Sequence, residues 1–200
     1  MRRSHAQRTA ETRAKIIAAV VDSIAEQGFE RTTAKAVVRR AGVTWGAVQH
    51  HFGGKNGMLL AVVEDSFARF AAHLEDLRLD TPLAERAARF IELAWAHFRS
   101  RHHRSTFEIL LNALGRQAPG SDRDWRQQMW HAWNTVWSRV FADSRLPRQR
   151  SLRLQHFTIS TLSGLAAMVT LQGGEAILPK QELDLLKDAL VRELTDSGTG

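Results

Sequence analysis

Cysteine is absent from this chain of 200 residues. Its absence excludes disulfides, thiolate metal sites and cysteine nucleophiles, and agrees with an intracellular, cytoplasmic protein. The chain also lacks any run of about 18 apolar residues, so we expect neither a membrane-spanning helix nor a membrane partner. Residues 5–15 are polar and provide no apolar centre for a secretory signal. The apolar fraction of 44% is that of a globular protein.

Alternation with a period of two is missing as well, and nearly every stretch repeats its apolar residues with helical spacing. We therefore predict an all-α protein of about nine helices, with three short helices followed by about six longer ones. Later helices are expected near 125–141, 152–171 and 183–194. The first helix ends at Gly28, and one face of it carries Ile16, Ile17, Val20, Val21 and Ile24.

Positive charge is concentrated at the N-terminal end of the chain. Residues 1–57 hold ten lysines and arginines against four acidic residues, which gives +6 of the net charge of +7. The other 143 residues contribute +1. A basic segment suits a polyanion such as nucleic acid or an anionic membrane surface, although a solvated basic face has the same composition.

The stretch AGVTWGAVQHHFGGK at 41–55 places a sharp corner between two short helices. Thr33 is positioned to cap the start of the first of these helices, and Thr44 the start of the second. Gly42 can take the left-handed conformation that a tight corner requires. This pattern is typical of a helix-turn-helix, whose second helix enters the DNA major groove. A small core behind the corner is expected from Val43, Val48 and Phe52.

Residues 12–64 carry an ordered series of motifs: an isoleucine-rich helix, then Gly28-Phe29, Thr32-Thr33, Ala41-Gly42-Val43, Gly46, His51-Phe52, Lys55 and Leu59. In this order they resemble the TetR (tetracycline-repressor) family of bacterial regulators. The resemblance implies a helix-turn-helix DNA-binding domain with a basic N-terminal tail at 1–57. It further implies an effector-binding and dimerisation domain at 58–200, where the likeness is limited to length and helical pattern.

The sequence departs from the family pattern at several positions near the corner. Val38 stands where the family usually has alanine, and Gln49 where it usually has a tyrosine that reaches the DNA backbone. Gly54, Asn56 and Gly57 replace a capping serine and good helix formers. These differences leave the DNA contacts in place, but an operator sequence is not transferable from a relative.

The outward face of the second short helix is expected to carry Trp45 and Gln49, opposite Val48. An exposed tryptophan can contact a thymine methyl group, although packing on the domain's own surface would also account for it. Helix N-terminal amides and hydroxyl, imidazole and ammonium groups suit phosphates. The predicted DNA-binding residues are Thr33, Thr44, Trp45, Gly46, Ala47, Gln49, His50, His51 and Lys55.

Adjacent histidines occur twice, at His50-His51 and at His102-His103. Neighbouring helical residues point about 100° apart, so neither pair is suited to hold one metal ion. The second pair is expected at a solvated helix end. No nucleophile motif such as GxSxG is present. We therefore expect no metal, no cofactor and no enzymatic activity.

The helix expected at 125–141 carries Trp130, Trp133 and Trp137 on one stripe. Ordinary core packing is the simpler explanation for each of them. The family resemblance, however, implies a small effector among the middle helices, and an indole-walled cavity would suit an apolar or aromatic one. The predicted ligand-binding residues are Trp95, Phe98, Phe107, Trp130, Trp133, Asn134, Trp137 and Met168.

The segment QHFTISTLSGLAAMVTLQGG at 155–174 is nearly free of charge and rich in small residues. Packing within one chain would cover it, but the resemblance implies a two-fold four-helix interface with the last helix. A homodimer would also present two reading heads about 34 Å apart to a palindromic operator. The predicted interface residues are Leu162, Leu165, Ala166, Val169, Leu183, Leu186 and Leu190.

These expectations combine into a homodimeric, ligand-responsive DNA-binding regulator of transcription. Its expected partners are double-stranded DNA and a small apolar or aromatic effector that releases it, as a repressor, from its operator. Three alternatives remain open. They are a transcriptional activator, an effector-independent regulator controlled by a protein partner, and a helical enzyme acting on a small molecule.

Overall fold

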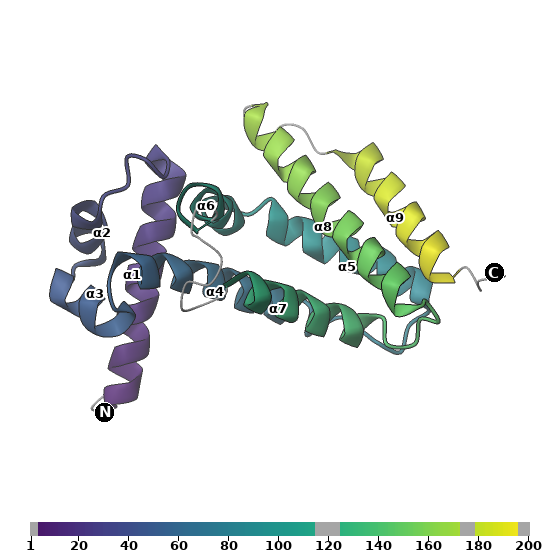
Figure 1. Cartoon of the computed structure of the whole chain (residues 1–200), viewed down its shortest axis with the longest axis horizontal. Coiled ribbons are helices and arrows are strands. Elements are labelled where there is room, and N and C mark those ends of the chain that lie inside the picture. The colour runs from purple at the N-terminus through teal and green to yellow at the C-terminus, as the bar shows by residue number, and fades with distance from the viewer. Residues whose placement is uncertain (1–3, 115–124, 173–178, 196–200) are drawn as a thin grey trace. The chain divides into compact units, whose positions relative to one another are not determined.

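A computed structural model describes residues 4–114, 125–172 and 179–195 (Figure 1). Within these ranges the chain forms nine α-helices and no strand, which confirms the predicted all-α fold. None of the helices in the described ranges is long and apolar enough to span a membrane. The helices are α1 (His5–Gln27), α2 (Ala34–Ala41), α3 (Trp45–Phe52), α4 (Lys55–His73), α5 (Leu83–Phe98), α6 (Arg101–Ile109), α7 (Trp125–Val140), α8 (Arg148–Leu171) and α9 (Lys180–Thr195), with a π-helical segment, η1 (Leu110–Leu114), after α6.

The chain divides into two compact units. Unit 1 comprises Met1–Arg69 and Ser100–Gln127, and unit 2 comprises Phe70–Arg99 and Gln128–Gly200. Unit 1 therefore contains α1, α2, α3, most of α4, and α6. The prediction that the first helix is short is wrong, because α1 has 23 residues. The functional boundary expected between residues 57 and 58 stays a prediction.

Helix α1 begins well before its apolar stripe. Ser4 and Gln7 form a capping box, in which the Ser4 hydroxyl accepts from the Gln7 N–H at 3.2 Å and the Gln7 side chain accepts from the Ser4 N–H at 2.8 Å. The polar first half of the helix is thereby fixed at its start. The second half buries Ile16, Val20 and Ile24 completely.

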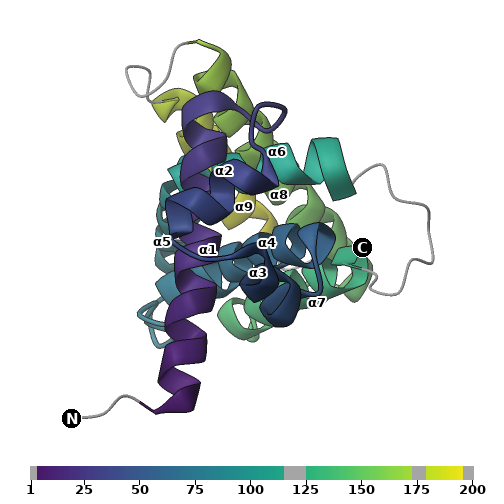
Figure 2. The same ribbon diagram turned by 90° about the vertical axis from the view of Figure 1, so that its left-hand side faces the viewer.

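Unit 1 is built around α1. Helices α2 and α6 both pack against it, and α3 contacts both α1 and α2 (Figure 2). Val37 on α2 and Val48 on α3 are buried at the centre of this arrangement. Between α6 and α1, the Ser105 hydroxyl donates a hydrogen bond to the Val21 carbonyl at 3.0 Å. The short helices α2 and α3 therefore rest on α1, which α6 supports from another side.

Unit 2 has α5 as its central helix, which contacts α8 and α9. Phe90, Ile91 and Ala94 of α5 are fully buried. Arg86, also buried, donates to both carboxylate oxygens of Asp143 at 2.5 and 2.6 Å. Because a buried guanidinium is costly without a partner, this ion pair fixes the segment after α7 against the start of α5.

The structure corrects part of the predicted dimer interface. Its residues on α8 and α9 do not form one exposed face, because the two helices also pack on each other and on α5. Leu165, Ala166 and Val169 are partly buried. The side chains that lie in the core of a single chain, and so offer little surface to a partner, are Leu162, Leu183, Leu186 and Leu190.

Candidate nucleic-acid interface and ligand pocket

The corner between α2 and α3 is closed by backbone geometry. Gly42 has φ 66° and ψ 34°, in the left-handed region, and its successor Val43 donates to the Val38 carbonyl at 3.0 Å. The Thr33 and Thr44 hydroxyls accept hydrogen bonds from Ala36 and Ala47, as N-caps of α2 and α3. The predicted helix-turn-helix is therefore present.

The two faces of α3 lie as predicted. Val48 is completely buried, whereas Trp45 keeps 42% of its surface exposed, and Gln49 and His50 are exposed beside it. An exposed tryptophan at the first turn of a short helix is the largest apolar group on this surface. Its ring is free to meet another molecule.

The predicted DNA-binding residues lie on or beside three consecutive helices, α2, α3 and α4. Seven belong to α3 or cap it, Thr33 caps α2, and Lys55 begins α4. Lys55 is exposed, and Gly46 has room for a further methyl group, 3.6 Å from the Thr44 hydroxyl. Three helix N-termini and an ammonium group therefore lie within 23 residues of sequence, a composition suited to phosphate contacts.

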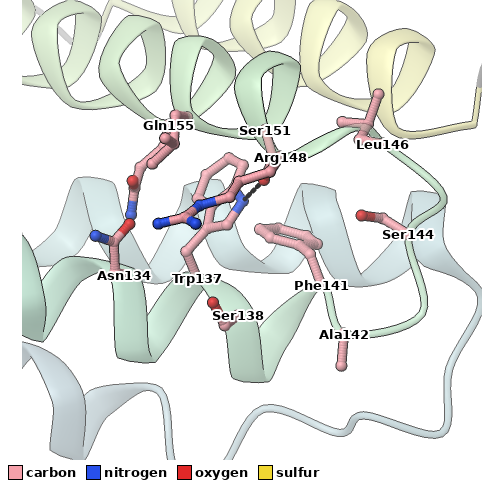
Figure 3. Close-up of a pocket in the computed structure, with 11 residues that line it drawn as sticks. Asn134, Trp137, Ser138, Phe141, Ala142, Ser144, Leu146, Arg148, Ser151 and Gln155 are labelled. Atoms are coloured by element: carbon pink, nitrogen blue, oxygen red, sulfur yellow. Dashed lines mark hydrogen bonds between the residues drawn. The ribbon is translucent and has the colours of Figure 1, made fainter.

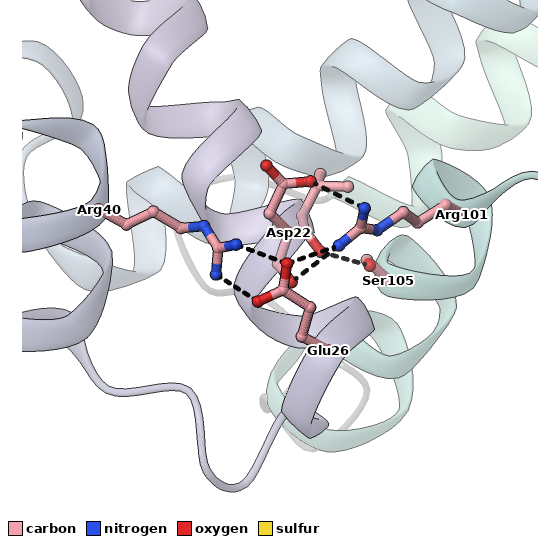
Figure 4. A network of polar contacts seen from close by, with 6 residues as sticks. Asp22, Glu26, Arg40, Arg101 and Ser105 are labelled. Atoms are coloured by element: carbon pink, nitrogen blue, oxygen red, sulfur yellow. Dashed lines mark hydrogen bonds and ion pairs between the residues drawn. The ribbon is translucent and has the colours of Figure 1, made fainter.

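A charged network braces α2 and α6 against α1 (Figure 4). Glu26 of α1 accepts two hydrogen bonds from Arg40 of α2, at 2.5 and 2.7 Å, and one from Arg101 of α6, at 3.1 Å. Arg101 also pairs with Asp22 at 3.5 Å. The Arg40 guanidinium, and then Arg101, hold the pKa of Glu26 below its usual value. One carboxylate of α1 therefore holds both α2 and α6.

Helix α6 makes a second contact at the end of α1. The Glu108 carboxylate accepts a hydrogen bond from the Phe29 backbone N–H at 2.8 Å. The same helix holds the second histidine pair, which is not the solvated helix end expected from sequence. Burial lowers the pKa of His103 to about 4, and His102 lies 3.2 Å from the Asp65 carboxylate of α4.

The predicted ligand-binding residues do not share one cavity. Trp133 packs on Phe70 and Phe98 with ring centroids 4.5 and 5.9 Å apart, and Trp95 is buried as well. These side chains form the core of unit 2. The others are dispersed: Trp130 stacks on His156, Met168 is exposed on α8, and Phe107 belongs to unit 1.

A pocket of about 540 Å³ lies between α7 and the start of α8 (Figure 3). Two of the predicted residues, Asn134 and Trp137, line it. The Trp137 indole N–H donates to the Ser151 hydroxyl at 3.0 Å, which fixes the ring across the pocket. Sequence periodicity did not reveal the remaining wall, which is Ser138, Phe141, Ala142, Ser144, Leu146, Arg148, Ser151, Leu152 and Gln155.

Comparison with known proteins decides what the N-terminal domain is. A model of the tetR family of bacterial regulatory proteins matches residues 16–62. The HTH-type transcriptional regulator BetI of Burkholderia thailandensis is 42% identical over 65 residues. Residues 16–62 therefore form an N-terminal domain of the TetR type, called the TetR domain below. The match covers 30% of this chain and 33% of BetI, so it spans about a third of that relative.

Solved structures extend the likeness of fold over most of the chain. The multidrug binding protein EbrR, complexed with imidazole, superposes with a TM-score of 0.66 at 18% identity, covering 94% of this chain and 92% of EbrR. FadR from Bacillus subtilis, in complex with stearoyl-CoA, gives 0.62 at 17% identity, covering 91% and 97%. Over most of its length the chain therefore shares its fold with these two proteins.

The structure explains one departure from the TetR pattern. A Cβ atom at Gly57, in the first turn of α4, would lie 1.8 Å from the Phe52 carbonyl oxygen. Any other residue would force the end of α3 and the start of α4 apart. Gly57 therefore permits a close backbone approach at the end of the recognition helix.

Arg13, in the first half of α1, is a residue that sequence reasoning missed. Its guanidinium donates to the His51 carbonyl at 2.6 Å and lies over the Phe52 ring, 4.4 Å from the centroid. The signal was its spacing, because Arg13 precedes Ile16 and Ile17 by three and four residues and so shares their face of α1. Arg13 ties α1 to the C-terminal end of α3.

The imidazole of His51, in the last turn of α3, favours its neutral form more than a free imidazole does, because its pKa is lowered. Desolvation, and then the positive charges of His50, Arg13 and His5, lower the pKa of its imidazole from the ordinary value of 6.5. A neutral imidazole still offers one N–H to a phosphate oxygen.

Proposed function

We propose that the chain is a transcriptional regulator that reads double-stranded DNA with α3. The observation that carries the proposal is the division of that helix into a buried Val48 and an exposed Trp45 and Gln49, within a TetR domain. Trp45 meets a thymine methyl group or sugar edge in the major groove, and the Gln49 amide donates to and accepts from a base or a phosphate. Gly46 lets the backbone of α3 approach the DNA.

Phosphate contacts hold α3 in its groove. Thr33 and Thr44 accept from the backbone through their oxygens, so each hydroxyl hydrogen remains to donate to a phosphate. The Lys55 ammonium adds a charge beside the N-terminus of α4, where the helix dipole also favours an anion. His50 and His51 provide further phosphate contacts. The excess of six positive charges over residues 1–57 favours the polyanion at longer range.

Two chains act together as a homodimer on a palindromic operator. Support comes from an exposed apolar stripe on α8, where Phe157 is 50%, Met168 51% and Leu171 80% exposed. Gly164 lies on the same stripe with no atom within 4 Å of a built Cβ, so a partner helix can approach closely there. Leu185 of α9 adds a second exposed apolar side chain. Burying this stripe at a two-fold axis gives an isologous interface.

The α7–α8 pocket is the effector site, and the regulator is a cytoplasmic repressor without enzymatic activity. EbrR and FadR, which share the fold, were solved with imidazole and with stearoyl-CoA. An effector that favours one spacing of the two α3 helices weakens operator binding by its differential affinity. A coupling of about 1–3 kcal/mol changes operator affinity by about five- to 150-fold.

Footprinting on the DNA that flanks the chain's own gene tests this function. We expect protection of a palindrome whose half-site centres are about 34 Å apart on one face of the duplex. The protected fragment then supplies the operator for affinity measurements. Protection that covers a single half-site would contradict the dimer, and protection of no discrete site in this or any genomic fragment would contradict the regulator.

A further inference from the structure

The α7–α8 pocket has a positively charged wall. Among its described lining residues Arg148 is charged and none is acidic, while Asn134, Gln155 and three serines are polar. We propose that this pocket binds an aromatic carboxylate. The inference deepens the effector role proposed above and rests on it for its regulatory meaning. The chemistry follows from three features of the pocket.

The first feature is the start of α8. This helix of 24 residues begins after Pro147 with no side-chain cap and no acidic residue in its first turn. The first backbone N–H groups of α8, those of Arg148 and Gln149, therefore lack intrahelical acceptors and lie at the positive end of the helix dipole. Arg148 is exposed and forms no ion pair with the described residues, and its side chain is directed across the pocket toward α7 (Figure 3). Guanidinium and helix terminus together favour a carboxylate.

The second feature is the Gln155 side chain. Gln155 is 1% exposed, lines the pocket, and has no hydrogen-bond partner for either amide atom among the described residues. A buried amide that makes no hydrogen bond destabilises the fold, so its presence calls for a partner. A polar group on a bound molecule meets this need. Figure 3 shows the Gln155 amide on the same side of the pocket as Asn134.

The third feature is an aromatic and apolar wall. The rings of Trp137 and Phe141 lie 4.7 Å apart at 60°, and Leu146 and Leu152 continue the surface. The Ser151 hydroxyl oxygen accepts from the Trp137 indole N–H and holds the ring in place. The hydroxyl hydrogen of Ser151 can therefore donate to a ligand oxygen. A volume of about 540 Å³ is ample for a small aromatic molecule.

These features disfavour the other classes of ligand. A cationic ligand would face Arg148 and the positive end of α8 with no carboxylate to receive it. A purely apolar ligand, one of the two classes expected from the sequence, would leave the Gln155 amide unsatisfied and would desolvate the guanidinium. An aromatic carboxylate fills both the polar and the apolar part of the wall.

The test uses 2-naphthoate as the probe, with the neutral 2-naphthamide as its isostere. In calorimetric titrations of the full chain at pH 7.5 we expect 2-naphthoate to bind about tenfold or more tightly than 2-naphthamide, because charge-assisted hydrogen bonds are lost in the amide. Acetate, which lacks the rings, is expected to bind at least about tenfold more weakly than 2-naphthoate. Equal affinity for the acid and its amide would overturn the proposal.

Three variants locate the site. Arg148→Gln should remove the preference for 2-naphthoate over 2-naphthamide, whereas Arg153→Gln, at an exposed position of α8 outside the pocket, should retain it. Gln155→Leu should weaken 2-naphthoate several-fold without lowering the melting temperature, because the replaced amide makes no hydrogen bond within the described chain. Unchanged binding by either Arg148→Gln or Gln155→Leu would overturn the assignment of the pocket.

A separate readout distinguishes this proposal from the proposed function. Operator affinity is measured by fluorescence anisotropy with and without saturating 2-naphthoate. Binding that depends on Arg148 but leaves operator affinity unchanged supports the carboxylate site and contradicts its role as effector site. Operator binding that fails altogether contradicts the regulator and leaves the calorimetric result to decide the pocket.

Discussion

The Arg13 guanidinium donates a hydrogen bond to the His51 backbone carbonyl at 2.6 Å. The two residues are 38 positions apart, and the bond joins the polar half of α1 to the last turn of α3. It satisfies one of the carbonyls that a helix leaves open at its C-terminal end. Arg13 therefore helps to set the orientation of α3 through a backbone carbonyl.

Arg13→Met tests this connection. The methionine keeps an apolar stem against Phe52 but loses the charged hydrogen bond, so we expect the free energy of unfolding to fall by about 1–3 kcal/mol. Operator affinity should fall as well, since α3 is held less firmly. Urea denaturation and anisotropy measure the two effects. Lys15→Met, at an exposed position of the same helix, should leave stability unchanged; an equal loss there would show that the effect is one of net charge.

Trp45→Ala should reduce discrimination between operator and mutated operators. Each lost base contact costs about 1–3 kcal/mol at the base pair it reads and little elsewhere. Anisotropy titrations against a set of single-base-pair variants check this expectation. A uniform loss of affinity on all duplexes would assign Trp45 to the backbone.

Lys55→Ala should act in the opposite way. All duplexes should bind more weakly, and the slope of log affinity against log salt concentration should decrease by about one unit per reading head. Titrations at four or more salt concentrations measure the slope. Lys180→Ala provides the matched control because Lys180 likewise begins a helix, α9, outside the TetR domain. If the slope changed equally in Lys180→Ala, the result would contradict a specific phosphate contact of Lys55.

Gly57→Ala should destabilise the protein although alanine favours helices. Helix propensity alone predicts a gain of about 1 kcal/mol. The added Cβ, however, would stand 1.8 Å from the Phe52 carbonyl oxygen, so we expect a net loss of about 2 kcal/mol or more. Gly46→Ala is the matched control, since its Cβ would meet ordinary contact at 3.6 Å. Thermal denaturation should show Gly46→Ala at least as stable as the natural chain, and the same measurement showing Gly57→Ala stable would refute the close approach.

Stability should decrease as the pH falls from about 6.5 to about 4. His103 has a folded-state pKa of about 4, lowered by burial from 6.5, so the unfolded chain takes up its proton first. The stability that neutral His103 contributes is fully present above pH 6.5. It is lost as the pH falls through this window, by about 3 kcal/mol in total. In urea denaturation from pH 7 to 4, His103→Gln should show a shallower decline. His131→Gln, at an exposed position of α7, should decline like the natural chain; the same slope in all three proteins would exclude His103.

The recognition helix was predictable because its signals are local. Thr44, Gly42 and Val48 determine the cap, the corner and the buried face, and each acts within one or two helical turns. The start of α1 has a local signal too, the capping box of Ser4 and Gln7. The polar stretch after it has no apolar spacing, so periodicity did not indicate that the helix begins there. Periodicity detects a helix by the face it buries, and residues 5–15 bury little.

The pocket was not predictable from the same signals. A tryptophan is equally suited to a cavity wall and to a buried core. Tertiary packing places Trp95 and Trp133 in the core. The unsatisfied amide of Gln155 depends on its neighbours from α7 and has no sequence signature. In the same way, the stripe of leucines on α9 indicates a buried face without indicating which helix covers it, and α5 and α8 do so.

Sedimentation velocity with a labelled operator duplex at low salt tests most directly whether paired α3 helices read DNA. We predict that the free chain sediments as a dimer and that the smallest complex contains two chains on one duplex. Trp45→Ala should remain a dimer while losing preference for the operator. A chain that sediments as a monomer and leaves the duplex unbound at low salt would contradict the proposed regulator.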